Sequence, residues 1–257
     1  MKIILSGING RMGKTVCDCA KLRGFEVVAG SGLPGTHDHT IPFYENVADI
    51  TEKADVLLDF SHHSQTKAVL EYAVSKKIPV VISTTGQTNE EIEMIISYSK
   101  KHPVFYSRNM SLGIATLCEL VKNAAKILGE NFDIEIIEMH HNKKLDAPSG
   151  TALMIYEELR SVLDYEPNIA GDRSKVREAR KPQEIGIHAV RGGSIIGEHE
   201  VLFCGNGETI RVSHSAQGRE VFAEGALRAC EFMLSCGNGL YTMKEVLEHA
   251  KNMAVIN

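Results

Sequence analysis

The sequence predicts an α/β protein in which a doubly wound parallel sheet is joined to a central α+β domain with an open mixed sheet. Through the first half of the 257 residues, short apolar runs alternate with amphipathic segments, which is typical of a parallel sheet covered by helices. From about residue 134 polar and apolar residues alternate along the strands, and residues 205–207 (Gly-Asn-Gly) form a strong hairpin signal. Helical patterns return after residue 219, and we expect them to pack on the first half. The predicted domains are therefore residues 1–111 with 219–257, and residues 112–218.

The first half is expected to alternate strand and helix. The helix that follows the first strand has a natural end at Gly24. Ser64 is the expected N-cap of the next helix, and Thr88 and Glu91 form a capping box for a third that runs to about residue 101. Buried strands are predicted at residues 3–6, 25–29, 56–60, 79–82 and 104–106.

The second half has a different texture. A long helix is predicted at residues 112–128, ended by Gly129, and another helix begins at the N-cap Ser149. Residues 171–183 are polar and charged, so we expect a loop or lid there. Thr242 and Glu245 form a capping box for the last helix. The other predicted elements are a strand at 134–139, antiparallel strands at 185–190, 197–204 and 208–213, and helices at 221–235 and 243–251.

Composition and charge exclude several classes of protein. The formal net charge of −5 argues against a dedicated nucleic-acid binder, which would be basic. No run approaches the roughly 18 apolar residues that cross a membrane, and the apolar start is too short for a signal peptide. The six cysteines include no C-x-x-C pair, so we expect reduced thiols, a cytoplasmic protein and no metal site.

Gly7, Gly10 and Gly13 lie between the first strand and the first helix, where a dinucleotide-binding turn is expected. Their spacing is a variant of G-x-G-x-x-G, but a tight turn and a helix start that faces phosphate follow from it equally. The first domain is therefore predicted to be Rossmann-like. Residues 29–33, at the end of the second strand, carry no carboxylate for the adenosine ribose, and Arg11 offers charge for a 2′-phosphate. NADH and NADPH both remain candidate cofactors.

Polar residues also follow the fourth and fifth predicted strands. Residues 83–86 (Ser-Thr-Thr-Gly) come after one strand and residues 109–111 (Asn-Met-Ser) after the next. Because the carboxyl ends of parallel strands share one edge of a sheet, we expect both segments to lie near the nicotinamide or the substrate.

The most informative stretch is residues 138–151, which read E-M-H-H-N-K-K-L-D-A-P-S-G-T. His140 and His141 can carry a proton near neutral pH, and the two lysines that follow add fixed positive charge. Ser149 begins a helix whose free N–H groups can hold a carboxylate or a phosphate, and the glycine after it lets a ligand approach the backbone. Together with the glycine turn, these residues predict a dinucleotide-dependent enzyme that acts on an anionic substrate.

The combination of motifs resembles the 4-hydroxy-tetrahydrodipicolinate reductase family, long called dihydrodipicolinate reductase. The matching pieces occur in order along nearly the whole chain. They are G-x-x-G-R-M-G at residues 7–13, Thr-Thr-Gly at 84–86, E-x-H-H-x-x-K-x-D-A-P-S-G-T-A at 138–152, Arg-Gly-Gly at 191–193, Gly-Glu-His at 197–199 and Phe-Ala-x-Gly-Ala at 222–226.

The resemblance implies reduction of 4-hydroxy-tetrahydrodipicolinate, a dicarboxylate, to tetrahydrodipicolinate with NADH or NADPH in lysine and diaminopimelate biosynthesis. It implies a dinucleotide-binding domain at residues 1–111 and 219–257, and a substrate-binding domain at 112–218 that makes a homotetramer through strands around 197–213. His140 is the implied general acid, and Lys144 pairs with a substrate carboxylate and helps the chemistry. The other implied substrate-binding residues are His141, Ser149, Gly150, Thr151 and Thr85. The implied cofactor-binding residues are Gly7, Asn9, Gly10, Arg11, Met12, Gly13, Ser31, Phe60, Ser83, Thr84, Thr85, Gly86, Ser107, Arg108, Asn109 and Met110.

Three positions depart from the family pattern. Ser31 and Gly32 replace the charged pair that usually sorts NADH from NADPH, residues 62–63 (His-His) stand where a proline is frequent, and Met110 replaces an aromatic residue. Two other functions remain open: an NAD(P)-dependent dehydrogenase of amino or imino acids, and a nucleotide-sensing protein without catalysis. The dehydrogenase would release ammonia from an amino acid, and the sensor would bind the nucleotide without turnover.

Overall fold

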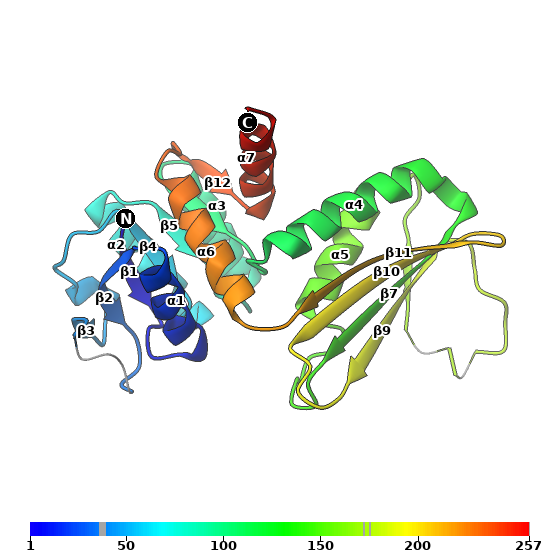
Figure 1. The fold of residues 1–257 in the computed structure, drawn as a ribbon, viewed down its shortest axis with the longest axis horizontal. Coiled ribbons are helices and arrows are strands. Elements are labelled where there is room, and N and C mark those ends of the chain that lie inside the picture. Colours follow the sequence, from blue (N-terminus) through cyan, green and yellow to red (C-terminus); the bar gives the residue numbers. More distant parts are fainter. Residues whose placement is uncertain (36–39, 172, 175, 257) are drawn as a thin grey trace. The chain divides into compact units, whose positions relative to one another are not determined.

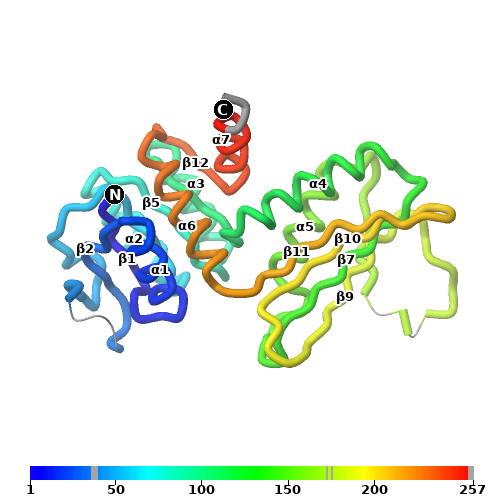
Figure 2. The backbone as a smooth tube through the Cα atoms, viewed as in Figure 1, coloured from blue at the N-terminus to red at the C-terminus, as the bar shows by residue number. Residues whose placement is uncertain are grey.

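The computed structural model describes residues 1–35, 40–171, 173–174 and 176–256. The chain divides into two compact units, Met1–Leu112 with Arg219–Asn257, and Gly113–Gly218, and each is described by itself. Figure 1 shows their helices and strands. Figure 2 traces the backbone, in which the blue start and the red end of the chain both belong to the first unit.

The first unit is built on a seven-stranded sheet in which neighbouring strands are parallel. Its central strands are buried on both faces, as Ile3, Ile4 and Leu57 show, and the predicted doubly wound sheet is confirmed. The sequence does not predict β3 or β12, because two or three residues are too few to show a period. In the order β12-β6-β5-β4-β1-β2-β3, the strands are Gly239–Tyr241, Pro103–Tyr106, Val80–Ile82, Val56–Asp59, Lys2–Ser6, Glu26–Ser31 and Phe43–Tyr44.

Helices cover both faces of this sheet (Figure 1). α1 (Arg11–Leu22) packs with α6 (Glu220–Met233) on one face, and α2 (Thr66–Lys76) packs with α3 (Asn89–Ser99) on the other. α7 (Met243–Ile256) packs on α6. α6 lies very close to the segment that follows β6, since a Cβ atom at Gly225 would overlap the carbonyl group of Met110.

Three caps are predicted for helices of the first unit, and two of them are capping boxes. The capping box of Thr88 and Glu91 at the start of α3 is confirmed in both directions. At α7 the Glu245 carboxylate accepts a hydrogen bond from the Thr242 N–H at 2.7 Å, but the Thr242 hydroxyl accepts from the N–H of Lys244 instead of Glu245. That capping box is therefore formed in one direction only.

The prediction that Ser64 caps α2 is wrong. A short 3₁₀ turn, η2 (His63–Gln65), precedes the helix, and the cap of that turn is the His62 side chain, which accepts from the Ser64 N–H. α2 then begins directly from the turn, and Gln65 makes no side-chain capping bond. The cap has moved upstream because the 3₁₀ turn adds helical backbone before the first α-helical residue. A second 3₁₀ turn, η1 (Val47–Asp49), follows β3.

The second unit contains a five-stranded mixed sheet, and the predicted open mixed sheet is confirmed. β10 and β11 form the predicted antiparallel hairpin, and β10 also pairs antiparallel with β7. β9 was expected to be antiparallel but runs parallel to β7, because the chain returns through a helix and the unpredicted strand β8 before it enters β9. In the order β11-β10-β7-β9-β8, the strands are Thr209–Ala216, Gly197–Cys204, Asp133–His140, Glu184–Arg191 and Asn168–Ala170.

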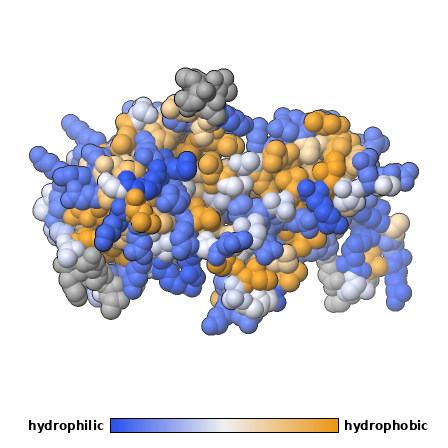
Figure 3. All heavy atoms as spheres, in the orientation of Figure 1, coloured by the Kyte–Doolittle hydropathy of each residue, from blue (hydrophilic) through white to orange (hydrophobic). Residues whose placement is uncertain are grey.

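Two helices cover one face of this sheet. α4 (Leu112–Leu128), which matches its predicted bounds, and α5 (Gly150–Arg160) pack their apolar residues on Ile134 and Ile136 of β7. A 3₁₀ turn, η3 (Gly129–Asn131), joins α4 to β7. On the face drawn in Figure 3, apolar atoms gather over the region of α4, where Leu120 and Ile127 are exposed.

The alternation along β7 continues past its apolar residues. Its buried positions are Ile134, Ile136, Glu138 and His140, so the strand carries an acid and an imidazole on its core face. A buried charge requires a partner, so Glu138 is expected to have charged or hydrogen-bonding partners near the end of β7.

The loop predicted at 171–183 has no helix or strand at residues 171, 173–174 and 176–183, while residues 172 and 175 lie outside the described residues. All six cysteines are free. In the part of the chain that the structure describes, no helix has the length and apolar character needed to cross a membrane.

Leu57→Ala should destabilise the first unit strongly. Leu57 is 0% exposed in the centre of the sheet, and truncating a buried leucine costs about 2–5 kcal/mol in the free energy of unfolding. The matched control is Leu22→Ala at the end of α1, where the side chain is 86% exposed and the change should stay within about 0.5 kcal/mol. Denaturant unfolding of both variants measures the difference, and equal losses would contradict the assigned core.

Candidate active site

The turn after β1 is shaped for close approach to a ligand. Gly7 has a φ of +83° and donates its N–H to the Ser31 carbonyl at 2.7 Å. A Cβ atom at Gly7 would overlap the Phe60 carbonyl, and one at Gly13 would overlap the Gly7 carbonyl. α1 starts at the N-cap Gly10 with no side-chain capping bond and no acidic residue in its first turn. Its first N–H groups are therefore available to an anion such as a pyrophosphate.

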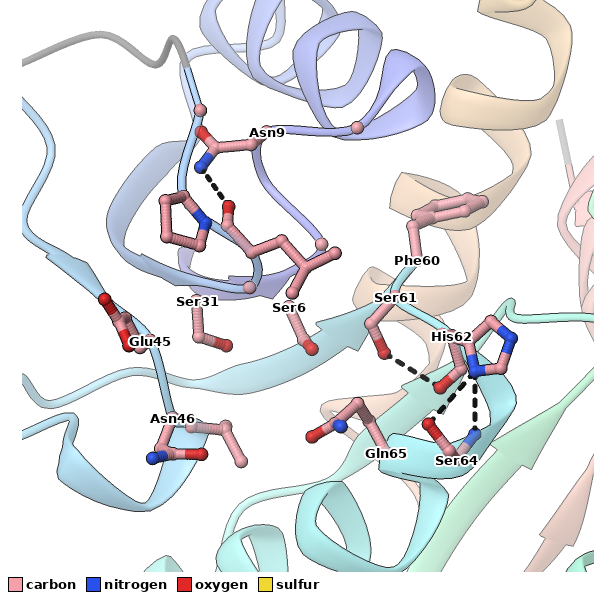
Figure 4. A pocket seen from close by; sticks show the side chains of 17 residues that line it. Ser6, Asn9, Ser31, Glu45, Asn46, Phe60, Ser61, His62, Ser64 and Gln65 are labelled. Atoms are coloured by element: carbon pink, nitrogen blue, oxygen red, sulfur yellow. Dashed lines mark hydrogen bonds between the residues drawn. The ribbon is translucent and has the colours of Figure 1, made fainter.

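A cavity of about 770 Å³ lies beside this turn. Its walls come from the segments that follow β1, β2, β3 and β4, at the carboxyl edge of the sheet. Figure 4 shows Glu45 and Asn46 on one side of it and Phe60, Ser61 and His62 on the other. Asn9 donates to the Leu33 carbonyl at 2.7 Å, and its own carbonyl oxygen is buried without a partner among the described residues. The volume, the location and the unpaired polar atom fit the adenosine end of a dinucleotide.

The predicted cofactor residues separate into three groups in the structure. Gly7, Asn9, Gly10, Ser31 and Phe60 line the cavity. Arg11, Met12 and Gly13 form the first turn of α1. The remaining ones follow β5 and β6 at the same edge of the sheet and, of the described residues, do not line this cavity: Ser83, Thr84, Thr85, Gly86, Ser107, Arg108, Asn109 and Met110.

A buried carboxylate connects two of the loops at this edge. Asp59, the last residue of β4, accepts from the Thr84 hydroxyl at 2.7 Å and from the Ser61 hydroxyl at 2.6 Å. Burial raises the pKa of Asp59, and these hydrogen bonds oppose the rise. Asp59 therefore fixes the position of the segment after β5, which carries Thr84 and Thr85, relative to the segment after β4.

Glu138 is the centre of the polar site in the second unit. Its carboxylate is 0% exposed and accepts a hydrogen bond from each terminal nitrogen of Arg191, at 2.8 and 2.7 Å. It also lies 2.6 Å from His140 Nδ1 and accepts from the Ser149 backbone N–H at 3.0 Å. Burial alone would raise the pKa of Glu138, but the hydrogen bonds from Arg191, His140 and Ser149 lower it, so the group is an anion.

His140 is held in one orientation by that anion. Its Nδ1 faces Glu138, and a Cβ atom at Gly197 would lie 3.2 Å from its Nε2. Burial lowers the pKa of His140 below the ordinary 6.5, and the positive charges of Lys144 and Arg191 lower it further, although Glu138 opposes them. A weakly basic imidazole whose second nitrogen faces a glycine is suited to give a proton to a bound molecule.

His199 supports this arrangement from the adjacent strand β10. Its ring makes an edge contact with His140, with centroids 5.3 Å apart, and its Nε2 lies 3.2 Å from the Ser149 hydroxyl. Burial lowers the pKa of His199 to about 4. The Ser149 hydroxyl, in a residue 1% exposed, also accepts from the Ala152 N–H and confirms the predicted cap of α5.

The cap of α5 engages the two polar groups of Ser149 that could otherwise bind a ligand. Both the hydroxyl and the N–H of Ser149 are engaged inside the protein. α5 begins at Gly150, and the positive end of its helix dipole favours an anion at this point.

Lys144 lies in the loop that joins β7 to α5. Its ammonium group pairs with Asp146 at 2.8 Å, and the Asp146 carbonyl accepts from Arg191 at 2.7 Å. Burial would raise the pKa of Asp146, but the Lys144 charge lowers it. His141 is half-buried, with an Nδ1 that has no partner among the described residues. Lys144 thus has an exposed counter-ion, Asp146, which a substrate carboxylate can join or replace.

The predicted site residues lie in both units. His140, His141, Lys144, Ser149, Gly150 and Thr151 belong to the second unit, while Thr85 and every predicted cofactor residue belong to the first. Within the described residues, no group of three or more His, Cys, Asp or Glu side chains is placed to hold a metal ion.

Comparison with known proteins decides the family. The family profile "Dihydrodipicolinate reductase, N-terminus" matches residues 1–110, and "Dihydrodipicolinate reductase, C-terminus" matches residues 113–247. The chain belongs to the dihydrodipicolinate reductase family. A 4-hydroxy-tetrahydrodipicolinate reductase from Caldanaerobacter subterraneus subsp. tengcongensis is 50% identical to it, over 96% of this chain and 98% of the relative. The corresponding protein of Clostridium novyi is 45% identical over 96% and 98%.

A solved structure of this reductase family is also similar. The dipicolinate-bound dihydrodipicolinate reductase of Paenisporosarcina sp. TG-14 matches with a TM-score of 0.77 and 25% identity, over 94% of this chain and 97% of that one. The similarity therefore extends over both units of the chain and supports the same fold for the whole molecule.

Four residues of this polar site were not assigned a role from the sequence. Glu138, Arg191 and His199 surround His140, and Asp146 holds Lys144. A signal for Glu138 was present, since it occupies a core position in the alternation of β7. Arg191 and His199 lie on other strands, and only the pairing of β9 and β10 with β7 brings them to the site.

Glu138→Gln should lower the pKa of His140 further. The substitution removes the anion that favours imidazolium, while burial and the Lys144 and Arg191 charges remain. An NMR titration of the His140 ring measures the shift in the folded variant. Glu200→Gln is the control, because Glu200 pairs with Arg211 on the neighbouring strands, and it should leave His140 unchanged. A pKa that rises or stays the same in Glu138→Gln would contradict the assigned electrostatics.

Proposed function

We propose that this protein reduces 4-hydroxy-tetrahydrodipicolinate to tetrahydrodipicolinate with NADH or NADPH. One hydride and one proton are added to the substrate, and one water is lost. The observation that carries the proposal is the buried Glu138–His140 pair beside Lys144 and the first turn of α5. Membership of the reductase family and a relative that binds dipicolinate, itself a cyclic dicarboxylate, support the same assignment.

The protonation falls to His140. When bound, the reduced nicotinamide supplies the hydride from its C4 atom. Because Nδ1 of His140 is turned to Glu138, Nε2 is the atom that delivers the proton to the substrate. Gly197 leaves room at that nitrogen, since even one added carbon would lie 3.2 Å from it. Glu138 acts through His140: its charge stabilises the imidazolium and fixes the ring.

Binding of the dicarboxylate falls to the positive groups around His140. Lys144 pairs with one carboxylate, and Gly150 and Thr151, at the positive end of α5, hold a carboxylate. His141 completes the polar surroundings. Holding the ring in one pose against His140 is the source of much of the rate, since positioning removes the entropic cost of bringing reactants together.

We further infer a role in lysine and diaminopimelate biosynthesis, in the cytoplasm, as a homotetramer. The names of the relatives support the pathway, and the resemblance of the chain to its family supports the tetramer. Light scattering of the purified protein tests the assembly, because a chain of 28.2 kDa would give about four times that mass as a tetramer. A mass of one chain would overturn the tetramer and leave the reductase reaction untouched.

The two alternative functions are tested by the same preparation. An amino-acid dehydrogenase would release ammonia in the presence of an oxidised nucleotide, and a sensor would bind nucleotide with no turnover. Family membership favours the reductase over both alternatives. The presence of His140 against Glu138 and of Lys144 against Asp146 favours it as well.

His140→Gln should reduce the rate by on the order of 10²–10⁴-fold, which is the usual contribution of a general acid. The assay condenses pyruvate and aspartate semialdehyde with a separate synthase and follows nicotinamide absorbance after this protein is added. His249→Gln, on the exposed surface of α7, is the control and should keep the wild-type rate. Wild-type rates in His140→Gln would sink the assigned role, and no consumption by folded wild-type protein would sink the reaction.

Lys144→Met should raise KM by about 10–100-fold, since a hydrogen-bonded charge pair with a carboxylate is lost. The neighbouring Lys143→Met is the matched control: its side chain is exposed, and its loss should leave KM within about twofold. Steady-state kinetics with saturating nucleotide separate KM from kcat. Equal effects of the two substitutions would show that general positive charge, and not Lys144 itself, holds the substrate.

A further inference from the structure

The cavity beside the glycine turn contains a carboxylate that the sequence pattern does not point to. Glu45 is the residue after β3, and its side chain lines the cavity together with Ser31 and Gly32 (Figure 4). In β2 and β3 the paired residues are Gly30 with Phe43 and Ser31 with Tyr44. The next residues, Gly32 and Glu45, therefore continue the two strands side by side.

Backbone hydrogen bonding holds Glu45 in this place. The Gly32 N–H donates to the Tyr44 carbonyl at 3.1 Å, which joins the end of β2 to the residue before Glu45. The Gly7 N–H in turn donates to Ser31. These two backbone hydrogen bonds connect the end of β2 to the glycine turn on one side and to the end of β3 on the other.

The Glu45 carboxylate is available to a ligand. No hydrogen bond or ion pair joins it to any described residue, and its residue is exposed to the cavity and solvent. The other acid in contact with β3, Glu52, is already engaged by the Tyr44 hydroxyl at 3.0 Å. Asn46, beside Glu45 on the same wall, likewise has no side-chain capping bond.

The charge of the cavity wall is one-sided. Among the described residues that line it, Glu45 is the acid, no lysine or arginine is present, and His62 is the one imidazole. Arg11, which the sequence suggested for a 2′-phosphate, stands exposed at the start of α1 and does not line this wall. A carboxylate accepts hydrogen bonds from ribose hydroxyls and repels a phosphate in the same position.

We propose that Glu45 determines the choice of nucleotide: it accepts from the ribose hydroxyls of the adenosine, excludes a 2′-phosphate, and makes the protein prefer NADH. The acid that usually ends β2 is thereby supplied by the neighbouring strand. The proposal rests on the proposed function in one respect, that a nicotinamide nucleotide binds in this cavity.

The test is the binding of NADH and NADPH to the full chain, without substrate, by isothermal titration calorimetry. We expect the wild type to bind NADH more tightly, by on the order of tenfold or more, as for a hydrogen bond to a charged group. Glu45→Gln should reduce that ratio by about tenfold, because the repulsion of the 2′-phosphate is lost. Glu45→Lys should reverse the preference.

Asp49→Asn is the matched control. Asp49 is an exposed acid of η1 that does not line the cavity, so the substitution removes the same charge from the same edge of the sheet. It should leave the ratio of the two dissociation constants unchanged, and circular dichroism checks that each variant is folded.

The outcomes are distinct. An unchanged ratio in both Glu45 variants, a wild type that prefers NADPH, or an equal change in Asp49→Asn would overturn the role of Glu45 while leaving the reductase function intact. Failure of the folded wild type to bind either nucleotide would overturn the proposed function and this inference together.

Discussion

A single buried carboxylate, Glu138, organises the polar site of the second unit. Taking an anion out of water is costly unless every oxygen is satisfied, and Glu138 meets that requirement with Arg191, His140 and the Ser149 N–H. These partners come from three separate elements: the end of β9, the end of β7 and the start of α5. Satisfying one charge therefore fixes the orientation of the imidazole, the position of a helix start and the path of the loop that carries Lys144.

In the first unit, the loops at the carboxyl edge of the sheet must also be held in place. Parallel strands end at one edge, where their loops have no ladder to hold them. Close packing at Gly7 and Gly13, and the buried Asp59 that accepts from Ser61 and Thr84, place these loops instead. The glycine turn of the first unit thus offers small residues and main-chain groups, whereas the polar site of the second unit is formed by charged side chains. The two chemistries match a phosphate-bearing ligand and a dicarboxylate, respectively.

The parts of the molecule that could be predicted are those with local signals. The helix at residues 112–128 has a long apolar period, the Thr88 box and the Ser149 cap are short motifs, and all three are confirmed. The direction of β9 depends on which strand it meets, which local sequence does not specify. The contact of Arg191 with Glu138 joins residues that are 53 positions apart, and Glu45 follows a two-residue strand. Such contacts arise only when the sheets are assembled.

The division of the first unit between the two ends of the chain has a consequence during synthesis. Residues 113–218 leave the ribosome before α6 and β12, which follow residue 219. Until then the sheet made by the first 112 residues lacks an edge strand and the helix that packs with α1 on one of its apolar faces. The inserted unit has all of its own strands by that time and can complete its core first. A nascent chain therefore leaves part of this sheet face uncovered while the inserted unit is being translated, and α6, which follows that unit, covers it.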